Sequence, residues 1–536
     1  MITEKHEQMK KFLKIYLSTS VILLATLVSC DKFDEVNIDP TKSSDMDPGL
    51  QLAWVQVNYS GHLENVERLN TMMTMPMVQH IGGIWANRWG QMYIKSANYM
   101  HIIWENSYPN DVLNIVDAVE RTTDDETKTN LNAICRIMRV YVFARLTDLY
   151  GDIPYTEASQ AAFSGLVRPA YDKQEDIYND FFKELKEAAQ QLDAAKDPVP
   201  TDLFYSGDIA LWKKFANSLR LRCAMRLIKV NPTKAEAEAV SAYEDGVFAS
   251  NEEMCIMKHE NVQSDYADVR GNAASVGINQ HEVLPRLSNT LINAMRNTND
   301  PRLAQIARYY IDVPYQPFTR VDITQQVVDV VGYTGVNPTD YVWDDWKPSF
   351  DINVPGRGAY TVSNNEQKAQ LANFLIQNDA PFFHLTYAEV ELLLADASLR
   401  FGNKFGDNAQ IHYERGVRAA LEQLALFRGG PVIPNADITT FVQGVPLIPG
   451  RELEIVNTQL WIALFLNGPE AYANWRRTGY PVLPSSVTGE SDITTTPRRF
   501  EYPLTEREQN STNYQAAVQR LSGGDAWNSR VWWDAE

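Results

Sequence analysis

The chain has 536 residues, 44% of them hydrophobic, and a formal net charge of −19 at pH 7. Residues 1–29 carry four lysines and two glutamates, so the chain from Cys30 onward has a net charge near −21. Nucleic acids and anionic membrane surfaces repel a protein of this charge, so we expect neither as a partner.

The amino-terminal segment has the pattern of a secretory signal peptide. Lys10, Lys11 and Lys14 precede an apolar run over residues 15–28, which ends in small residues. This run of about 14 residues is shorter than the roughly 20 that a membrane-spanning helix needs. We therefore expect residues 1–29 to be a signal peptide that is removed, whether translation starts at Met1 or at Met9.

Cys30 ends a short motif behind this apolar run. The string LVSC at residues 27–30 resembles a bacterial lipobox, in which the cysteine is acylated and becomes the first residue of the mature chain. Asp31, Asp34 and Glu35 follow. They resemble the surface-export signal of lipoproteins in the Bacteroidetes, although a solvated tether is an alternative interpretation. We expect Cys30 to carry lipid and residues 30–48 to form a flexible tether.

The remaining cysteines and the histidines suggest neither a disulfide framework nor a transition-metal site. Three cysteines follow Cys30, an odd number, and Cys135 and Cys223 lie on the apolar stripes of predicted helices. No Cys-x-x-Cys pair and no His-x-x-x-His spacing occurs. We expect buried thiols, no metal site of this kind and no cofactor; the sequence leaves calcium open.

Hydrophobic periodicity predicts a dominantly helical segment up to about residue 248. Apolar residues recur at three, four and seven positions over residues 131–149, and Gly151 follows where a left-handed cap would lie. The same period predicts helices over residues 174–192 and 210–229. Paired helices of this size suggest a helical-repeat scaffold, although no repeat consensus is legible.

The third of these helices carries Arg220, Arg222 and Arg226 beside its apolar face. Three arginines on one helix can form a phosphate or carboxylate site. Arginines in such a position more often cover apolar surface with their stems or pair with acids of the same fold. We favour the structural interpretation.

From residue 250 to residue 380 the chain is rich in Gly, Asn, Pro and aromatic residues and has no sustained helical period. This composition predicts loops and short strands. Helical periodicity returns over residues 386–397, 411–427 and 458–466, and a proline-rich stretch separates the last two. We expect one folded unit over residues 49–536, with its helical scaffold over about 110–248 and 386–480.

Several segments in chain order together resemble the SusD/RagB family of nutrient-binding outer-membrane lipoproteins. The most specific are RVYVFARLTDLYGDIP (139–154), WKKFANSLRLR (212–222), TYAEVELLLADA (386–397) and NWRRTGYP (474–481). The resemblance covers essentially the whole chain after Cys30. It implies a mainly α fold, a tetratricopeptide-like helix-pair scaffold with a long loop-rich ligand-binding region and few short strands.

The resemblance also implies a function. Members of this family sit as lids on SusC-like TonB-dependent transporters of the outer membrane, bind a glycan or sometimes a peptide, and break no bonds. We therefore expect a lipid-anchored protein that faces the cell exterior, partnered by such a transporter and by an oligosaccharide or peptide ligand. The motif residues Asp148, Tyr150, Gly151, Glu389 and Asp396 are expected to be structural, as caps or as anchors for arginines.

Two aromatic clusters are candidates for the ligand site. The first comprises Trp85, Asn87, Arg88, Trp89 and Tyr93; the second comprises Tyr341, Trp343, Trp346, Arg357 and Tyr360. Flat rings suit the C–H faces of a sugar, and short polar side chains suit its hydroxyl rim. The alternative is that these aromatics fill the core. The first cluster leaves the two interpretations even, whereas alternating Trp and Asp in a Pro/Gly-rich stretch favours an exposed loop for the second.

Two other classes of function stay open. A glycoside hydrolase needs two neighbouring carboxylates, but 68 acidic residues make such pairs uninformative. No Gly-x-Ser-x-Gly, Walker loop or His-Glu-x-x-His occurs to favour an enzyme. A pure interaction scaffold needs no tryptophan-rich loops. We expect a binding protein that is not an enzyme.

Overall fold

The computed structural model describes residues 46–279, 284–311 and 320–536. The predicted signal peptide, the lipidation site at Cys30 and nearly all of the tether lie outside these residues. The chain divides between Asp47 and Pro48, and the elements below belong to the unit that begins at Pro48. Over the described residues, no helix has the length and apolar character needed to cross a membrane.

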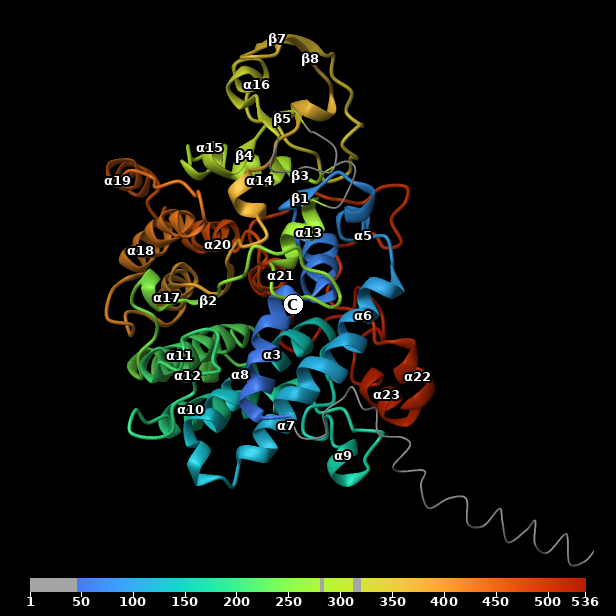
Figure 1. Ribbon diagram of the computed structural model, residues 1–536, viewed down its shortest axis with the longest axis vertical. Helices are drawn as coiled ribbons and strands as arrows, with labels where there is room; N and C mark the ends of the chain where they lie inside the picture. Colours follow the sequence, from blue (N-terminus) through green and yellow to red (C-terminus); the bar gives the residue numbers. More distant parts are fainter. Residues whose placement is uncertain (1–45, 280–283, 312–319) are drawn as a thin grey trace, which may run out of the picture. The chain divides into compact units, whose positions relative to one another are not determined.

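The amino-terminal half is a series of packed helices (Figure 1). Helix α7 packs on α8, α8 on α10, α10 on α11 and α11 on α12. The elements are α3 (Pro48–Gly61), π-helix η1 (Glu64–Thr74), α4 (Met75–Met77), β1 (Ile81–Gly82), η2 (Trp85–Asn87), α5 (Arg88–Gln91), α6 (Ala97–Ser107), η3 (Tyr108–Val112), α7 (Leu113–Thr122), η4 (Glu126–Lys128), α8 (Thr129–Tyr150), α9 (Ala161–Ser164), α10 (Gln174–Gln191), α11 (Ile209–Arg226) and α12 (Pro232–Glu244).

The carboxyl-terminal part supplies further helix pairs. Helix α17 packs on α18 and α20, and it also contacts α11 of the first half. The elements are α17 (Tyr387–Phe401), α18 (Ala409–Glu422), η9 (Gln423–Leu426), α19 (Asn435–Gly444), α20 (Glu452–Ala463), α21 (Gly468–Thr478), α22 (Leu504–Gln509) and α23 (Ser511–Val518). The mainly α, helix-pair architecture predicted from the sequence is thus confirmed.

Between these halves, the described strands pair only as two-stranded antiparallel sheets: β1 with β3, β2 with β10, β4 with β9, β5 with β6 and β7 with β8. The elements are η5 (Asn251–Glu253), β2 (Cys255–Met257), α13 (Ala273–Asn279), β3 (Arg286–Leu287), α14 (Asn289–Arg296), α15 (Arg302–Ile306), β4 (Ala307–Arg308), β5 (Tyr310–Ile311), β6 (Val321–Asp322), α16 (Thr324–Val331), β7 (Phe350–Val354), β8 (Gly358–Val362), η7 (Asn365–Gln367), β9 (Gln370–Leu371), η8 (Asn373–Ile376) and β10 (Phe382–Leu385).

Short helices in this region correct the prediction of loops and strands alone. Helices α13 to α16 have five to eight residues each, too few for a hydrophobic period to repeat. Helix α19 forms inside the proline-rich stretch because Pro434 stands at its N-cap, not in its interior. A proline there leaves the helical hydrogen bonds intact.

Local signals explain where the scaffold helices begin and end. The carboxylate of Asp208 accepts hydrogen bonds from the N–H groups of Ala210 and Leu211, which caps α11. The hydroxyl of Thr386 accepts from the N–H of Glu389 at 3.0 Å, which caps α17. Gly151 ends α8 with a φ of 88°, a conformation that glycine adopts without steric cost.

Buried ion pairs tie these helices together. Arg222 of α11 contacts Glu389 of α17 at 2.6 Å, and Arg477 of α21 contacts Asp396 of α17 at 2.6 Å. Arg226 of α11 pairs with Asp148 of α8 at 3.2 Å. Arg220, the third arginine of α11, pairs with Glu238 and Asp245. The predicted internal pairing of the three α11 arginines is thus confirmed, as is the role of Glu389 and Asp396 as anchors for arginines. Removing one partner of such a pair typically costs about 3 to 5 kcal/mol, because the other charge stays buried.

The three cysteines of the folded unit, Cys135, Cys223 and Cys255, are buried and free. Their predicted burial is confirmed, and it raises the pKa of the Cys223 thiol to about 12, which makes it inert near neutral pH. Among the described residues, no group of three or more His, Cys, Asp and Glu side chains is arranged to hold a metal ion.

Candidate functional site

The first aromatic cluster follows a tight turn after β1. Gly83 has a φ of 90°, and its N–H donates to Oε1 of Gln91 at 2.7 Å. A Cβ built on Gly90 would lie 2.0 Å from the carbonyl oxygen of Met73, so α5 can lie directly on η1 only because this residue is glycine. The turn therefore fixes η2 and α5, which carry the cluster, against the core.

The second cluster is bound to the first through the backbone. The N–H of Val342 donates to the carbonyl oxygen of Gly83 at 2.7 Å. The side chain of Gln91 also reaches across and donates to the carbonyl oxygen of Asp340 at 2.8 Å. Two segments separated by roughly half of the chain thus lie side by side.

This contact brings three aromatic rings into one array, which we call the aromatic platform: Trp85, Tyr341 and Trp343. The rings of Trp85 and Tyr341 lie 6.2 Å apart between centroids at an interplanar angle of 19°. Those of Tyr341 and Trp343 lie 5.1 Å apart at 9°. Trp85 is 58% exposed and Trp343 47%, whereas Tyr341 between them is 8% exposed. Two large apolar rings therefore face solvent on a fixed base.

Charged groups border the platform. The guanidinium carbon of Arg88 lies 3.2 Å from the ring centroid of Trp85 and 4.2 Å from that of Trp89. This cation–π geometry restrains both rings. The hydroxyl of Tyr341 donates to Glu490 at 3.2 Å, and burial together with this carboxylate raises the pKa of Tyr341. Arg88 and Glu490 thus supply a donor and an acceptor beside the rings.

A buried lysine supports the loop that carries Trp343. The ammonium of Lys368, a residue only 3% exposed, donates to the carbonyl oxygens of Val342 and Asp344 at 2.6 Å each. The carboxylate of Asp344 accepts from the N–H of Tyr341 at 2.9 Å. Burial lowers the pKa of Lys368. These bonds restrain the loop that carries Trp343.

The structure corrects two of the predicted site residues. Asn87 is fully buried, and its amide donates to the carbonyl oxygen of Thr71 at 2.9 Å. Tyr93 is 1% exposed, and its hydroxyl lies 3.0 Å from that of Thr496. Both residues belong to the core beneath the platform, because the backbone turns their side chains inward, and neither reaches the surface in this structure.

The other predicted residues lie at the surface in differing degrees. Trp89 is half-buried against Tyr99, with ring centroids 5.6 Å apart. Trp346 is 77% exposed on the same loop as Trp343. Arg357 is exposed at the turn between β7 and β8, and the hydroxyl of Tyr360 on β8 donates to Glu366. Glu490 and Lys368 were not predicted, since each joins the site only through tertiary contacts.

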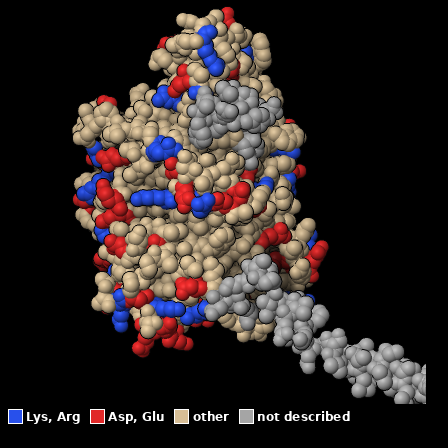
Figure 2. All heavy atoms as spheres, viewed as in Figure 1, with Lys and Arg blue, Asp and Glu red and all other residues tan. Residues whose placement is uncertain are grey.

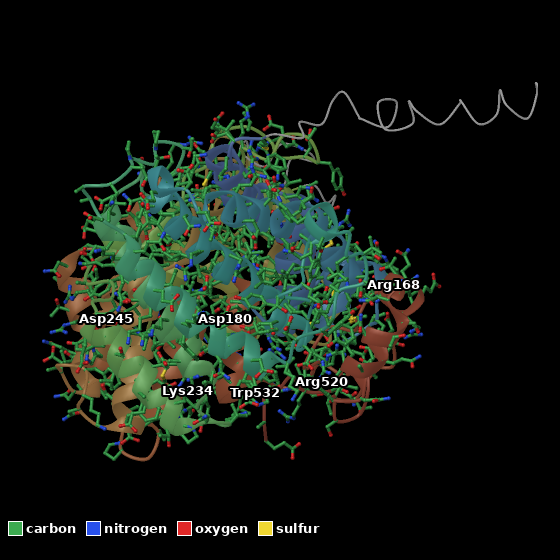
Figure 3. All side chains as sticks on the ribbon, turned by 90° about the horizontal axis from the view of Figure 1, so that it is seen from below. Arg168, Asp180, Lys234, Asp245, Arg520 and Trp532 are labelled. Carbon is green, nitrogen blue, oxygen red and sulfur yellow. The ribbon has the colours of Figure 1, made fainter. Side chains whose placement is uncertain are left out.

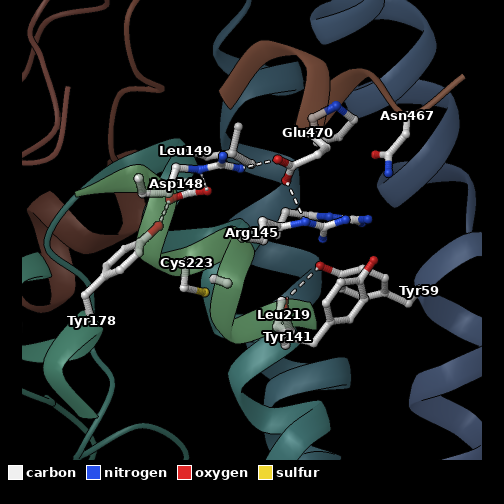
Figure 4. Close-up of a pocket in the computed structure, with 14 residues that line it drawn as sticks. Tyr59, Tyr141, Arg145, Asp148, Leu149, Tyr178, Leu219, Cys223, Asn467 and Glu470 are labelled. Atoms are coloured by element: carbon white, nitrogen blue, oxygen red, sulfur yellow. Dashed lines mark hydrogen bonds and ion pairs between the residues drawn. The ribbon is translucent and has the colours of Figure 1, made fainter. Parts of the chain in front are cut away.

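Two hollows elsewhere are less suited to an oligosaccharide. The first, shown in Figure 4, has a volume of about 40 Å³ and is lined by Arg145, Arg226, Asp148 and Glu470. It has room for a few water molecules but not for a sugar. The second has a volume of about 370 Å³, and its lining mixes acidic residues, among them Asp180, which Figure 3 labels, with basic ones such as Arg139 and Lys183. The lining lacks the exposed indole rings found at the platform.

Comparisons with known proteins agree on one family. A family model described as "Starch-binding associating with outer membrane" matches residues 41–503. A structure of a chitin-binding protein is 37% identical at a TM-score of 0.80, over 91% of this chain and 100% of that one. A structure described as "Bacteroidetes AC2a SusD-like" is 34% identical at a TM-score of 0.83, over 92% and 100%.

A chitin-binding SusD homologue from Flavobacterium johnsoniae shares the fold, at 24% identity and a TM-score of 0.71, over 91% of this chain and 99% of that one. No curated protein matches the chain.

Proposed function

Because the chain belongs to the SusD-like family, we propose that it is a cell-surface lipoprotein that binds a glycan and delivers it to a SusC-like TonB-dependent transporter. The family is associated with the outer membrane, which supports this location. The proposal includes no catalytic step, and the protein acts by binding alone.

The aromatic platform is the observation that carries the proposal. Trp85 and Trp343 expose large parts of rings that are held by Tyr341, Arg88 and the backbone of the adjoining loop. An indole face matches the C–H face of a pyranose, and fixed rings lose little conformational entropy on binding. Arg88 and Glu490 are placed to bond sugar hydroxyls at the border of the rings.

The relatives guide the choice of ligand to test. The name of the relative at 37% identity states that it binds chitin, and the family description states starch binding. On the face shown in Figure 2, acidic and basic side chains are interspersed, which suits an uncharged glycan. We therefore propose a neutral oligosaccharide, with chitin fragments as the first probe and starch fragments as the second.

Replacing one exposed ring tests the proposal. Trp343→Ala removes the apolar area that the ligand would cover and the contact between the ring face and the sugar. Together these are worth about 1 to 3 kcal/mol, so affinity should fall about tenfold to a hundredfold. The measurement is calorimetric titration with chitohexaose and maltohexaose, with a thermal melt of each variant. Since the ring is 47% exposed, we expect the melting temperature to stay near that of the wild type.

Phe163→Ala serves as the matched control, because Phe163 is also 47% exposed but lies on α9, away from the platform. It should leave affinity unchanged. A Trp343→Ala protein that binds as tightly as the wild type would contradict the proposed site. Binding of neither glycan series by the folded wild type would contradict the proposed function and favour the peptide alternative, and release of shorter sugars would indicate a hydrolase.

A further inference from the structure

Ring and guanidinium contacts continue beyond the platform, along α5, α6 and η1. From Arg88 and Trp89 the next contact is Tyr99 of α6, whose ring centroid lies 5.6 Å from that of Trp89. Arg68 of η1 lies over the ring of Tyr99, with its guanidinium carbon 5.4 Å from the centroid. Tyr99, Arg68 and Trp89 are each partly exposed. In Figure 1, α5 and α6 follow one another along the same side of the described unit.

The line of contacts ends at Tyr266. Nη2 of Arg68 donates to the hydroxyl of Tyr266 at 2.5 Å, and the ring of His62 meets that of Tyr266 edge-on at 6.1 Å. Tyr266 is 58% exposed, as exposed as Trp85 at the other end. We call Tyr266, Arg68, Tyr99 and Trp89 the distal strip.

The loop that carries Tyr266 is braced. Asp265 accepts hydrogen bonds from the N–H groups of Ala267 and Asp268 at 2.7 Å each, which closes a turn around Tyr266. At the base of the loop, the hydroxyl of Ser264 donates to the carbonyl oxygen of Gly271 at 2.6 Å. The exposed ring is thus presented by a fixed loop. Covering this ring with the apolar face of a ligand would remove apolar area from water, which is favourable.

We propose that the distal strip extends the platform into one continuous track and supplies further subsites, so that a long glycan chain contacts residues beyond the platform. This inference rests on the proposed glycan-binding function and adds the length of the ligand to it. A polymer of sugars repeats apolar faces and hydroxyl rims along its length. The track likewise combines a series of aromatic rings with the guanidinium groups of Arg68 and Arg88, which can donate hydrogen bonds. A disaccharide would cover only one end of it.

The test compares two ligand lengths on two variants. Chitohexaose should bind the wild type more tightly than chitobiose does, measured by calorimetry, with maltohexaose and maltose as the second series. Tyr266→Ala should weaken binding of the hexasaccharide by about threefold to tenfold and leave that of the disaccharide unchanged. Trp343→Ala should weaken both. Tyr266→Phe, which keeps the ring, should bind nearly as the wild type does.

A second measurement uses the unaltered protein, in case Tyr266→Ala disturbs the loop. The hexasaccharide, and not the disaccharide, should slow hydrogen exchange of the backbone amides of residues 264–268. Hexasaccharide binding without this protection, or with undiminished affinity in Tyr266→Ala, would overturn the long-track inference while leaving glycan binding intact. Failure of the wild type to bind either glycan series would instead overturn the proposed function.

Discussion

Lys368 illustrates how a buried residue can determine the shape of the proposed binding surface above it. Its ammonium holds the carbonyl oxygens of Val342 and Asp344, on either side of Trp343. Lys368→Met keeps most of the side-chain volume but removes both charge-assisted hydrogen bonds. We expect the free energy of unfolding to fall by about 1 to 3 kcal/mol and glycan affinity to fall roughly threefold to tenfold, because the loosened loop must be ordered on binding.

Lys347→Met is the control for this change. Lys347 lies on the same loop, but its side chain is 42% exposed and its ammonium lies 3.8 Å from the carboxylate of Asp345, in a surface pair that contributes little. Denaturant unfolding and glycan titration should both match the wild type. Equal effects of the two substitutions would show that the loop is not held by the buried ammonium.

At the level of single residues, the sequence predicted exposure well where the composition of a whole loop decided it. Trp343 and Trp346 stand in a Pro/Gly-rich stretch and are exposed as expected. Asn87 and Tyr93 differ, because each faces inward through a local turn that no pattern of residue types signals. Tyr93 adopts a φ of 55°, which is rare for a non-glycine residue. The contact between the two clusters could not be predicted, since it depends on hydrogen bonds and ring contacts between segments far apart in the sequence.

At the level of elements, the long helices were predictable and the short ones were not. Helices α8 and α10 extend over 22 and 18 residues and repeat their apolar face several times. The π-helix η1 could not be predicted, because no distinct pattern of residue types marks a π-helix. Yet η1 carries Arg68 of the distal strip and packs against α5, α6 and α13. A sequence-based account therefore misses the element that joins the two ends of the proposed track.

Glu67 on η1 is expected to make the free energy of unfolding depend on pH. Packing of α13 encloses Glu67, which is 3% exposed, and a Cβ on Gly277 would lie 2.9 Å from its Cγ. Burial raises the pKa of Glu67 from 4.5 to about 7, against the opposing effect of Arg68 and with a smaller contribution from Glu64. The folded state thus holds this proton more tightly than the unfolded state does. The contribution of Glu67 to the free energy of unfolding should therefore fall as the pH rises from about 4.5 to about 7. At higher pH it should stay constant.

Glu67→Gln tests this dependence, because glutamine mimics the protonated carboxyl group at every pH. The variant should gain on the order of 3 kcal/mol over the wild type between pH 4.5 and pH 7, measured by denaturant unfolding across that range. Glu120→Gln, at an exposed position on α7, should show no such gain. A difference between Glu67→Gln and the wild type that stays constant with pH would contradict the raised pKa.

At the level of the whole folded unit, the two sets of helix pairs meet at a cluster of buried charges (Figure 4). Arg222 and Arg226 of α11 both approach Glu470 at the start of α21, and Arg226 also reaches Asp148 of α8. The family-like motifs of the sequence supply two of these four residues, Asp148 and Arg222. Those motifs therefore build the scaffold, while the proposed ligand surface depends on residues outside them. This division explains why the motifs predict the fold but not the candidate site, whose rings were instead predicted from the aromatic composition of two loops.

The last prediction concerns the proposed lipid anchor at the amino-terminal end of the chain. The string ending at Cys30 predicts that the thiol is acylated, and stable attachment requires two or more acyl chains. Mass spectrometry of the protein purified from its membrane should find residue 30 as the amino terminus, with acyl chains attached. Cys30→Ala should leave the outer-membrane fraction, because the substituted chain cannot be acylated there. Ser29→Ala, which keeps a small residue before the cysteine, should stay in that fraction. An amino terminus that maps elsewhere, or a Cys30→Ala protein that still fractionates with the outer membrane, would show that the anchor assignment is wrong.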